Sequence, residues 1–214
     1  MRLVTLHSTL GALALALVTV ACEEPPPRSD VVVDIGPERP IDLGTGPDRG
    51  RRRMDIEQLD AAMRRATGGL GWDDSSGRSM FTAQAATLGV PDYVQSTSED
   101  LEISALFIKF LDDASRSVCD RLMTREAAAA PGERVFLVHA DLDARLPADA
   151  AAIDQNLSML LLRFHGRRVA VDSPELAPWH DLMDQALAAS PDDAAPAWRT
   201  TCVALFEHPD FYTY

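Results

Sequence analysis

The longest run of regularly spaced apolar residues sets the fold class that this chain can adopt. A stripe recurs at every third or fourth position, comprising Ile103, Phe107, Phe110, Ala114, Val118 and Leu122, with Leu106 and Leu111 beside it. This spacing is typical of one face of an α-helix. A stripe of this width packs against more than one neighbour. The predicted helix follows a polar lead-in at residues 96–99 and ends before Pro131.

Further helices are predicted from the same spacing, and glycine or proline marks most of their ends. They cover residues 54–67, 80–88, 149–165, 174–190 and 196–208. The segment 135–138 is either a short helix or a buried extended segment, because no second convincing strand is available to pair with it. We therefore expect an all-α domain of about six helices, bundle-like or orthogonal, over residues 54–214.

The first residues of the chain predict export. Arg2 supplies a positive charge, and residues 10–21 are uncharged and apolar or small, as in the central part of a signal peptide. That stretch is too short for a permanent membrane span, which needs about 20 apolar residues. Residues 19–22, Thr-Val-Ala-Cys, resemble the lipobox of bacterial lipoproteins, although Thr19 stands where leucine is commoner. The alternative is an ordinary secretory signal cut after residue 21.

The lipobox resemblance implies that residues 1–21 are removed and that Cys22 carries the lipid. It places the mature chain in the bacterial cell envelope, held on a membrane by its acyl chains. Residues 22–53 are expected to form a disordered tether, because their prolines and glycines leave no uninterrupted amphipathic stretch. The basic run at residues 51–53 is expected to be the solvated end of that tether.

The charge balance excludes some partners. The chain has 33 acidic and 20 basic residues, a net charge of −13. Nucleic acid binding needs clusters of Lys and Arg on the protein surface. Anionic lipid headgroups attract the same residues. We therefore expect no nucleic acid partner and no electrostatic binding to membranes.

Two cysteines remain after Cys22, at positions 119 and 202. In an oxidising envelope two such thiols often pair. A Cys119–Cys202 bridge would close a long loop, which the chain-entropy model values at about 4 to 5 kcal/mol. The alternative is two buried free thiols.

Several blocks of the domain resemble uncharacterised exported proteins of myxobacteria. They are residues 88–93, 106–114, 161–168 and 197–211, the last through its segments Ala-Trp-Arg and Cys-Val-Ala-Leu-Phe-Glu-His-Pro-Asp-Phe. The last two blocks are also similar to helical modules of large exported planctomycete proteins, some of which carry c-type haem domains. The resemblance implies a helical fold and an envelope location, and no reaction. The sequence has no Cys-x-x-Cys-His, so covalent haem is not expected.

The titratable residues suggest one candidate site. No two histidines of the domain have the spacing of a zinc motif, so we predict neither a metal, a cofactor nor a catalytic residue. Acidic pairs such as Asp141 and Asp143 are expected to be solvated, because their loop lacks the Gly and Glu of an EF-hand. A polar cluster would form where two helix ends meet, from residues that follow or end the helices: His165, Arg167, Arg168, His208 and Asp210.

We expect a membrane-anchored, non-catalytic domain that binds or scaffolds a protein partner in the envelope. Whether the chain is an enzyme stays open. The alternative is an accessory subunit or an enzyme of an exported hydrolytic or electron-transfer system. A cleft that gathers the polar cluster would favour an enzyme. Groups that are dispersed or packed as helix caps would favour the binding function.

Overall fold

The computed structural model describes residues 52–90, 94 and 99–214. The predicted signal peptide, Cys22 and the tether up to residue 51 lie outside these residues. The described part contains seven α-helices, two short 3-10 helices and no strand. The prediction of an all-α fold is therefore confirmed. None of the described helices has the length and apolar character needed to cross a membrane.

The first two helices differ in how well the sequence predicts them. α1 (Ile56–Thr67) starts at Asp55, which forms a capping box with Gln58, and stops at Gly68 in the left-handed conformation. α2 (Met80–Ala83) is a single turn, capped by Ser79. The predicted helix over 80–88 is wrong beyond this turn, where the chain continues through hydrogen-bonded turns.

The long helix α3 (Ala105–Ala128) begins later than the apolar spacing suggested. The side chain of Ser104 accepts the backbone N–H of Phe107 and so fixes the start of the helix. Ile103 therefore precedes the helix and is 42% exposed, and Leu106 in its first turn is 48% exposed. Their predicted burial is wrong. The rest of the stripe, from Phe107 to Leu122, packs in the core except for half-buried Phe110.

The C-terminal half follows its capping residues closely. α4 (Ala150–His165) ends at Gly166 in the left-handed conformation. α5 (Ala177–Ala189) follows a 3-10 turn that Ser173 caps. α6 (Ala195–Glu207) ends just before Pro209, as expected, but proline at the first position then begins the short helix α7 (Pro209–Tyr212).

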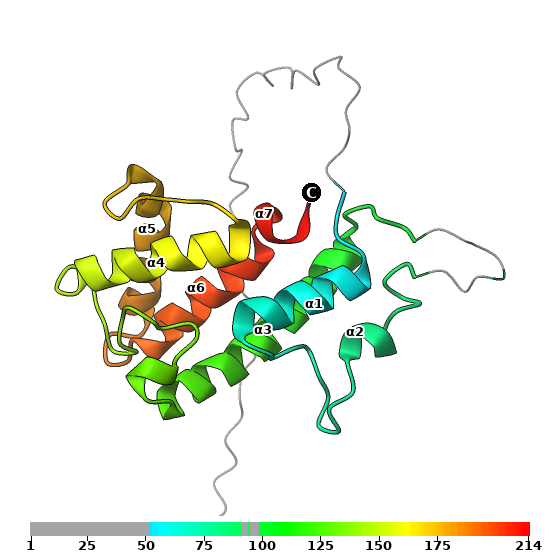
Figure 1. Cartoon of the computed structure of the whole chain (residues 1–214), viewed down its shortest axis with the longest axis horizontal. Coiled ribbons are helices and arrows are strands. Elements are labelled where there is room, and N and C mark those ends of the chain that lie inside the picture. The colour runs from blue at the N-terminus through cyan, green and yellow to red at the C-terminus, as the bar shows by residue number, and fades with distance from the viewer. Residues whose placement is uncertain (1–51, 91–93, 95–98) are drawn as a thin grey trace, which may run out of the picture. The chain divides into compact units, whose positions relative to one another are not determined.

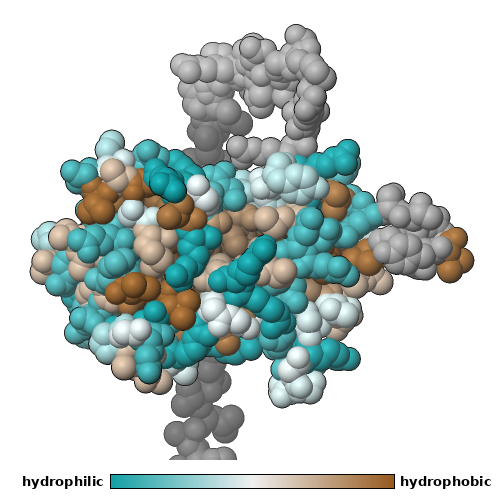
Figure 2. Space-filling model, viewed as in Figure 1, coloured by the Kyte–Doolittle hydropathy of each residue, from teal (hydrophilic) through white to brown (hydrophobic). Residues whose placement is uncertain are grey.

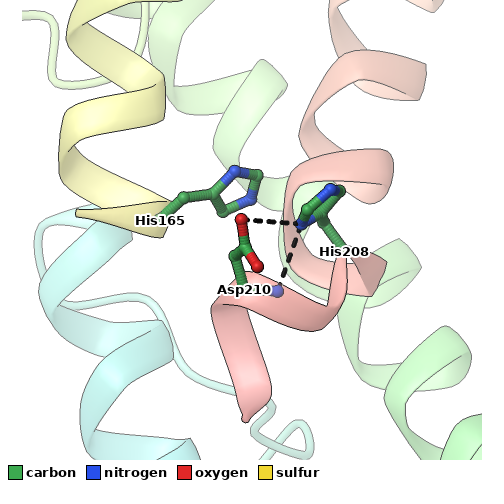
Figure 3. Close-up of side chains that lie close together, drawn as sticks. All are labelled: His165, His208 and Asp210. Atoms are coloured by element: carbon green, nitrogen blue, oxygen red, sulfur yellow. Dashed lines mark hydrogen bonds and ion pairs between the residues drawn. The ribbon is translucent and has the colours of Figure 1, made fainter. Parts of the chain in front are cut away.

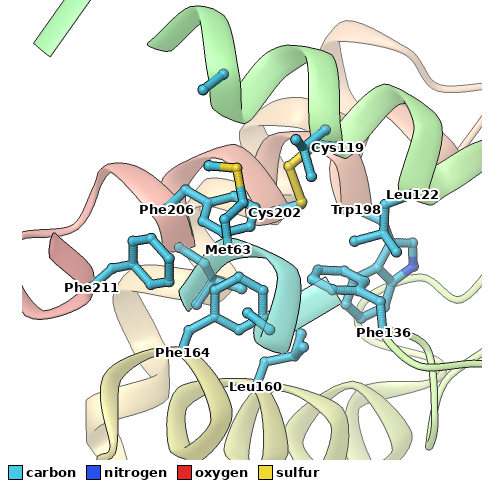
Figure 4. Packing of buried hydrophobic residues seen from close by; sticks show 14 of the residues in the cluster. Met63, Cys119, Leu122, Phe136, Leu160, Phe164, Trp198, Cys202, Phe206 and Phe211 are labelled. Carbon is cyan, nitrogen blue, oxygen red and sulfur yellow. A yellow bond between two sulfur atoms is a disulfide. The ribbon is translucent and has the colours of Figure 1, made fainter. Parts of the chain in front are cut away.

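α6 is the central helix of the domain (Figure 1). It packs against α3, α5, α4 and α7. Trp198 and Phe206 of α6 are fully buried among edge-to-face aromatic contacts with Phe136, Phe164 and Phe211 (Figure 4). These contacts place the core around α6.

The disulfide between α3 and α6 confirms the predicted pairing. Cys119 and Cys202 are joined, with Cα atoms 5.9 Å apart, and both residues are fully buried (Figure 4). The bond ties the middle of the long helix to the central helix.

The segment 135–138 is neither helix nor strand. Phe136 and Leu137 are buried, as expected for the buried extended alternative, whereas Val135 is half-buried and Val138 is exposed. Glu126 of α3, 1% exposed, binds it. Its carboxylate accepts the backbone N–H groups of Val135, Phe136 and Leu137 at 3.1, 3.0 and 2.9 Å. Asn156 of α4 holds the other side, donating to the Phe136 carbonyl at 3.1 Å.

Arg53 belongs to the folded domain. It was expected in the solvated end of the tether, but it is 2% exposed. Its guanidinium donates to the carbonyls of Met54, Leu88, Asp100 and Glu102, to the carboxylate of Glu99, and lies 4.8 Å from the centre of the Phe107 ring. These contacts form only in the folded chain, because most of the partners are distant in the sequence. The basic run therefore does not predict them.

The two ends of the described chain pair with each other. The N–H of Met54 donates to the Tyr212 carbonyl at 2.7 Å, and the N–H of Tyr214 donates to the Arg52 carbonyl at 3.1 Å. This short antiparallel pairing closes the domain at residues 52–54.

Candidate functional site

The structure gathers four of the five predicted cluster residues where the end of α4 meets the junction of α6 and α7 (Figure 3). One ring nitrogen from each of His165 and His208 and a carboxylate oxygen of Asp210 lie within 4.8 Å of one another. All three residues are half-buried. The three side chains therefore share one small volume at the domain surface.

His165 is the last residue of α4, and Gly166 turns the chain away behind it. Its Nε2 lies 2.9 Å from the Leu205 carbonyl oxygen, which can only accept, so Nε2 carries the proton. Burial lowers the pKa of His165, against a smaller opposite effect of that carbonyl. Burial therefore favours the neutral form of the ring. Its Nδ1 is buried and has no hydrogen-bond partner among the described residues.

His208 joins α6 to α7. Its Nδ1 accepts the backbone N–H of Asp210 at 3.1 Å and lies 3.7 Å from a carboxylate oxygen of the same residue. Its ring stacks on that of His165, with centroids 4.5 Å apart and an angle of 26° between planes. Trp179 of α5 packs against both rings, at 5.9 and 6.4 Å.

The two arginines of the predicted cluster separate. Arg167 lies 3.7 Å from the Asp210 carboxylate and also pairs with Glu175. Arg168 is exposed and forms no ion pair or hydrogen bond with the described residues. The structure therefore assigns Arg167 to the cluster and leaves Arg168 outside it.

The cluster offers a neutral imidazole, a second imidazole and a carboxylate. Within the described part of the chain, neither imidazole hydrogen-bonds a Ser, Thr or Cys side chain, as an activated nucleophile would. Both rings instead bind backbone groups at helix ends, so the groups meet and also serve as caps. The geometry suits cation binding or structural support better than acyl transfer.

The acidic loop at Asp141 and Asp143 forms a shallow pocket with Asp193. Arg134 lines the same pocket and donates to Asp141 at 2.9 Å. The arginine supplies the positive charge there. Asp141 and Asp143 are both exposed, as expected for acidic residues in contact with solvent.

Sequence reasoning missed three partners of the cluster: the ring of Trp179, the carboxylate of Glu175 and the carbonyl of Leu205. Trp179 lies inside the helix predicted over 174–190, and nothing in its spacing relates it to the cluster. Arg167 and Glu175 lie on either side of a loop, where no periodic pattern relates them. A backbone carbonyl leaves no mark in a sequence, so Leu205 had no signal.

No protein-family model, curated protein or solved structure matches this chain. The resemblance to exported myxobacterial and planctomycete proteins therefore stays a prediction.

Proposed function

We propose that the chain is a lipid-anchored domain of the bacterial envelope that binds a protein partner without catalysing a reaction. The lipobox-like residues before Cys22 support the anchor. The buried Cys119–Cys202 disulfide supports an oxidising compartment, because such bonds are rare in the cytosol.

The exposed apolar residues at the start of α3 carry the proposal of a protein partner. Ile103 and Leu106 are 42% and 48% exposed and lie three positions apart, whereas Ile108, 40% exposed, lies about 200° around the helix from Leu106. On the face in Figure 2, hydrophilic residues predominate and apolar ones form small separate groups. Single exposed apolar residues are ordinary, whereas a concentration of them marks interaction surfaces. We assign the binding surface to this end of α3.

The anchor is tested first. Mass spectrometry of the membrane fraction should show Cys22 as the acylated first residue of the mature chain, and Cys22→Ser should release the protein from the membrane. An unmodified wild-type product in the soluble fraction would overturn the anchor.

The binding surface is tested by photo-crosslinking in intact cells, with a crosslinking amino acid placed at position 103, three positions before Leu106. We expect one discrete adduct that Leu106→Glu abolishes, because a charge at the centre of an apolar contact is poorly tolerated. Leu162→Glu is the matched control, since Leu162 lies on α4 and is 47% exposed. An adduct that survives Leu106→Glu, or disappears equally with Leu162→Glu, would contradict the assignment.

A further inference from the structure

We propose that His165, His208 and Asp210 bind a divalent transition-metal ion, of which Zn²⁺ is the reference case. This site goes beyond the partner binding proposed above and does not depend on it. A bound metal ion would link the end of α4 to the junction of α6 and α7, because its three ligands come from these two parts of the chain (Figure 3).

The chemistry of the three groups fits such an ion. Two imidazole nitrogens and one carboxylate oxygen are a set that Zn²⁺ and related metals accept, with a fourth position left for water. Calcium and magnesium prefer oxygen ligands alone. The two histidines come from distant parts of the sequence, the end of α4 and the junction of α6 and α7, so the site has no spacing motif.

His165 is prepared for this role by its surroundings. Histidines that bind metals usually donate the other ring N–H to a carbonyl or carboxylate, which fixes the tautomer and the ring orientation. The Leu205 carbonyl holds His165 in this way at 2.9 Å. Because that carbonyl holds the proton on Nε2, the lone pair lies on Nδ1, a buried atom with no hydrogen-bond partner among the described residues. A bound cation would satisfy it.

A modest movement would complete the site. Zinc–nitrogen bonds are about 2.0–2.1 Å, so tetrahedral ligand atoms lie roughly 3.4 Å apart. The three ligand atoms now lie within 4.8 Å of one another. The side chains of His208 and Asp210 are 36% and 28% exposed, so the outer pair has room to turn inward. In doing so His208 would exchange the Asp210 N–H for the metal.

Arg167 gives the proposal a distinctive consequence. Its guanidinium lies 3.7 Å from the Asp210 carboxylate and competes with a metal for that group. It also pairs with Glu175, which can retain it when Asp210 turns away. Replacing Arg167 with a neutral residue removes a repelling charge and no ligand. A metal site should therefore bind more tightly in Arg167→Gln.

The experiment is isothermal titration of Zn²⁺ into the mature chain, residues 22–214, with Cys22→Ser to keep it in solution. We expect one ion per chain. His208→Ala and Asp210→Asn should each weaken binding by at least about tenfold, a loss that even outer-shell changes can produce. Arg167→Gln should strengthen it. At pH 5.5 binding should weaken, because protons compete for imidazole nitrogen.

His180→Ala is the matched control. His180 also contacts a carboxylate, that of Asp154 at 2.5 Å, but lies outside the cluster. It should leave zinc affinity unchanged. Far-UV circular dichroism and the urea midpoint check that each variant folds. The visible absorption of bound Co²⁺ gives a readout of ligand geometry. Absence of binding by the folded wild type would overturn the proposal, as would affinities insensitive to His208→Ala and Asp210→Asn.

Discussion

Removing the carboxylate of Glu126 tests whether one buried side chain positions the segment after α3. Glu126 is 1% exposed and accepts three consecutive backbone N–H groups at 2.9 to 3.1 Å. The hydrogen bonds to Phe136 and Leu137 are buried and share one carboxylate oxygen, Oε2. Glu126→Ala leaves these donors without a partner, and Glu126→Gln keeps one acceptor oxygen for them.

The two substitutions should differ in magnitude. A buried donor left unsatisfied costs about 1–3 kcal/mol, so two such donors put Glu126→Ala at about 2–6 kcal/mol. In Glu126→Gln the amide oxygen can serve Phe136 and Leu137, while its NH₂ faces the N–H of Val135. The loss of one hydrogen bond and of the charge on the others gives about 1–3 kcal/mol. Against a total stability of about 5–15 kcal/mol, the alanine variant is close to unfolding.

Equilibrium unfolding in urea of the oxidised mature chain measures both values. The slope of free energy against urea should stay constant, since the unfolded surface is nearly unchanged. Glu133→Gln is the control, because Glu133 is exposed in the 3-10 turn just before this segment. A loss below about 1 kcal/mol in Glu126→Ala would refute the reasoning. A glutamine variant as unstable as the alanine variant would refute the assigned geometry.

Three further substitutions make separate predictions. Replacing Cys119 and Cys202 by serine should lower the free energy of unfolding in urea by up to about 4–5 kcal/mol, because the bridge closes a long loop; an unchanged midpoint would contradict this. Arg53→Lys should lower the melting temperature by several degrees, since one ammonium group cannot replace a guanidinium that reaches several carbonyls, and Arg52→Lys, at an exposed position, should not. Burial, followed by the contact with Asp112, raises the pKa of Glu207. A raised pKa in the folded state favours the protonated form, so stability should fall as pH rises through that pKa, and Glu207→Gln should flatten this dependence; an equal slope in both proteins would rule it out.

The helix ends were largely predictable because their signals are local. Gly166 ends α4 and Ser173 caps the turn before α5, and each acts on backbone groups a few residues away. The start of α3 was mistaken because an apolar residue, Ile103, continues the helical spacing past the cap at Ser104. Spacing alone cannot show where the backbone turns out of the helix.

The buried polar groups were not predictable. Glu126 lies in a run of ordinary helix formers, and its function depends on N–H groups of a segment without regular structure. Arg53 looked like part of a solvated basic run, because its partners come from distant loops. Such residues are recognised only once the fold brings their partners together.

The candidate site was predictable only in part, because it depends both on local helix ends and on tertiary packing. The sequence places His165 at one helix end and His208 with Asp210 at another, so a contact between the two ends could be proposed. That α4 packs on α6 and α7, so that the rings stack, is a property of tertiary packing. Arg168 neighbours Arg167 in the sequence but lies outside the cluster, so adjacency in sequence does not decide membership.

The pairing of residues 52–54 with the C-terminal residues has a mechanical consequence. Tension applied through the proposed N-terminal anchor would enter the domain at Arg52, whose carbonyl accepts the N–H of Tyr214. The next residue, Arg53, donates hydrogen bonds to the carbonyls of Leu88 and Asp100 in the loops before α3, so part of the force is transmitted to these loops. The force is thus shared between two parts of the domain before it reaches α1. A pulled domain should hold at this junction while Arg53 is intact and yield at lower force when it is replaced.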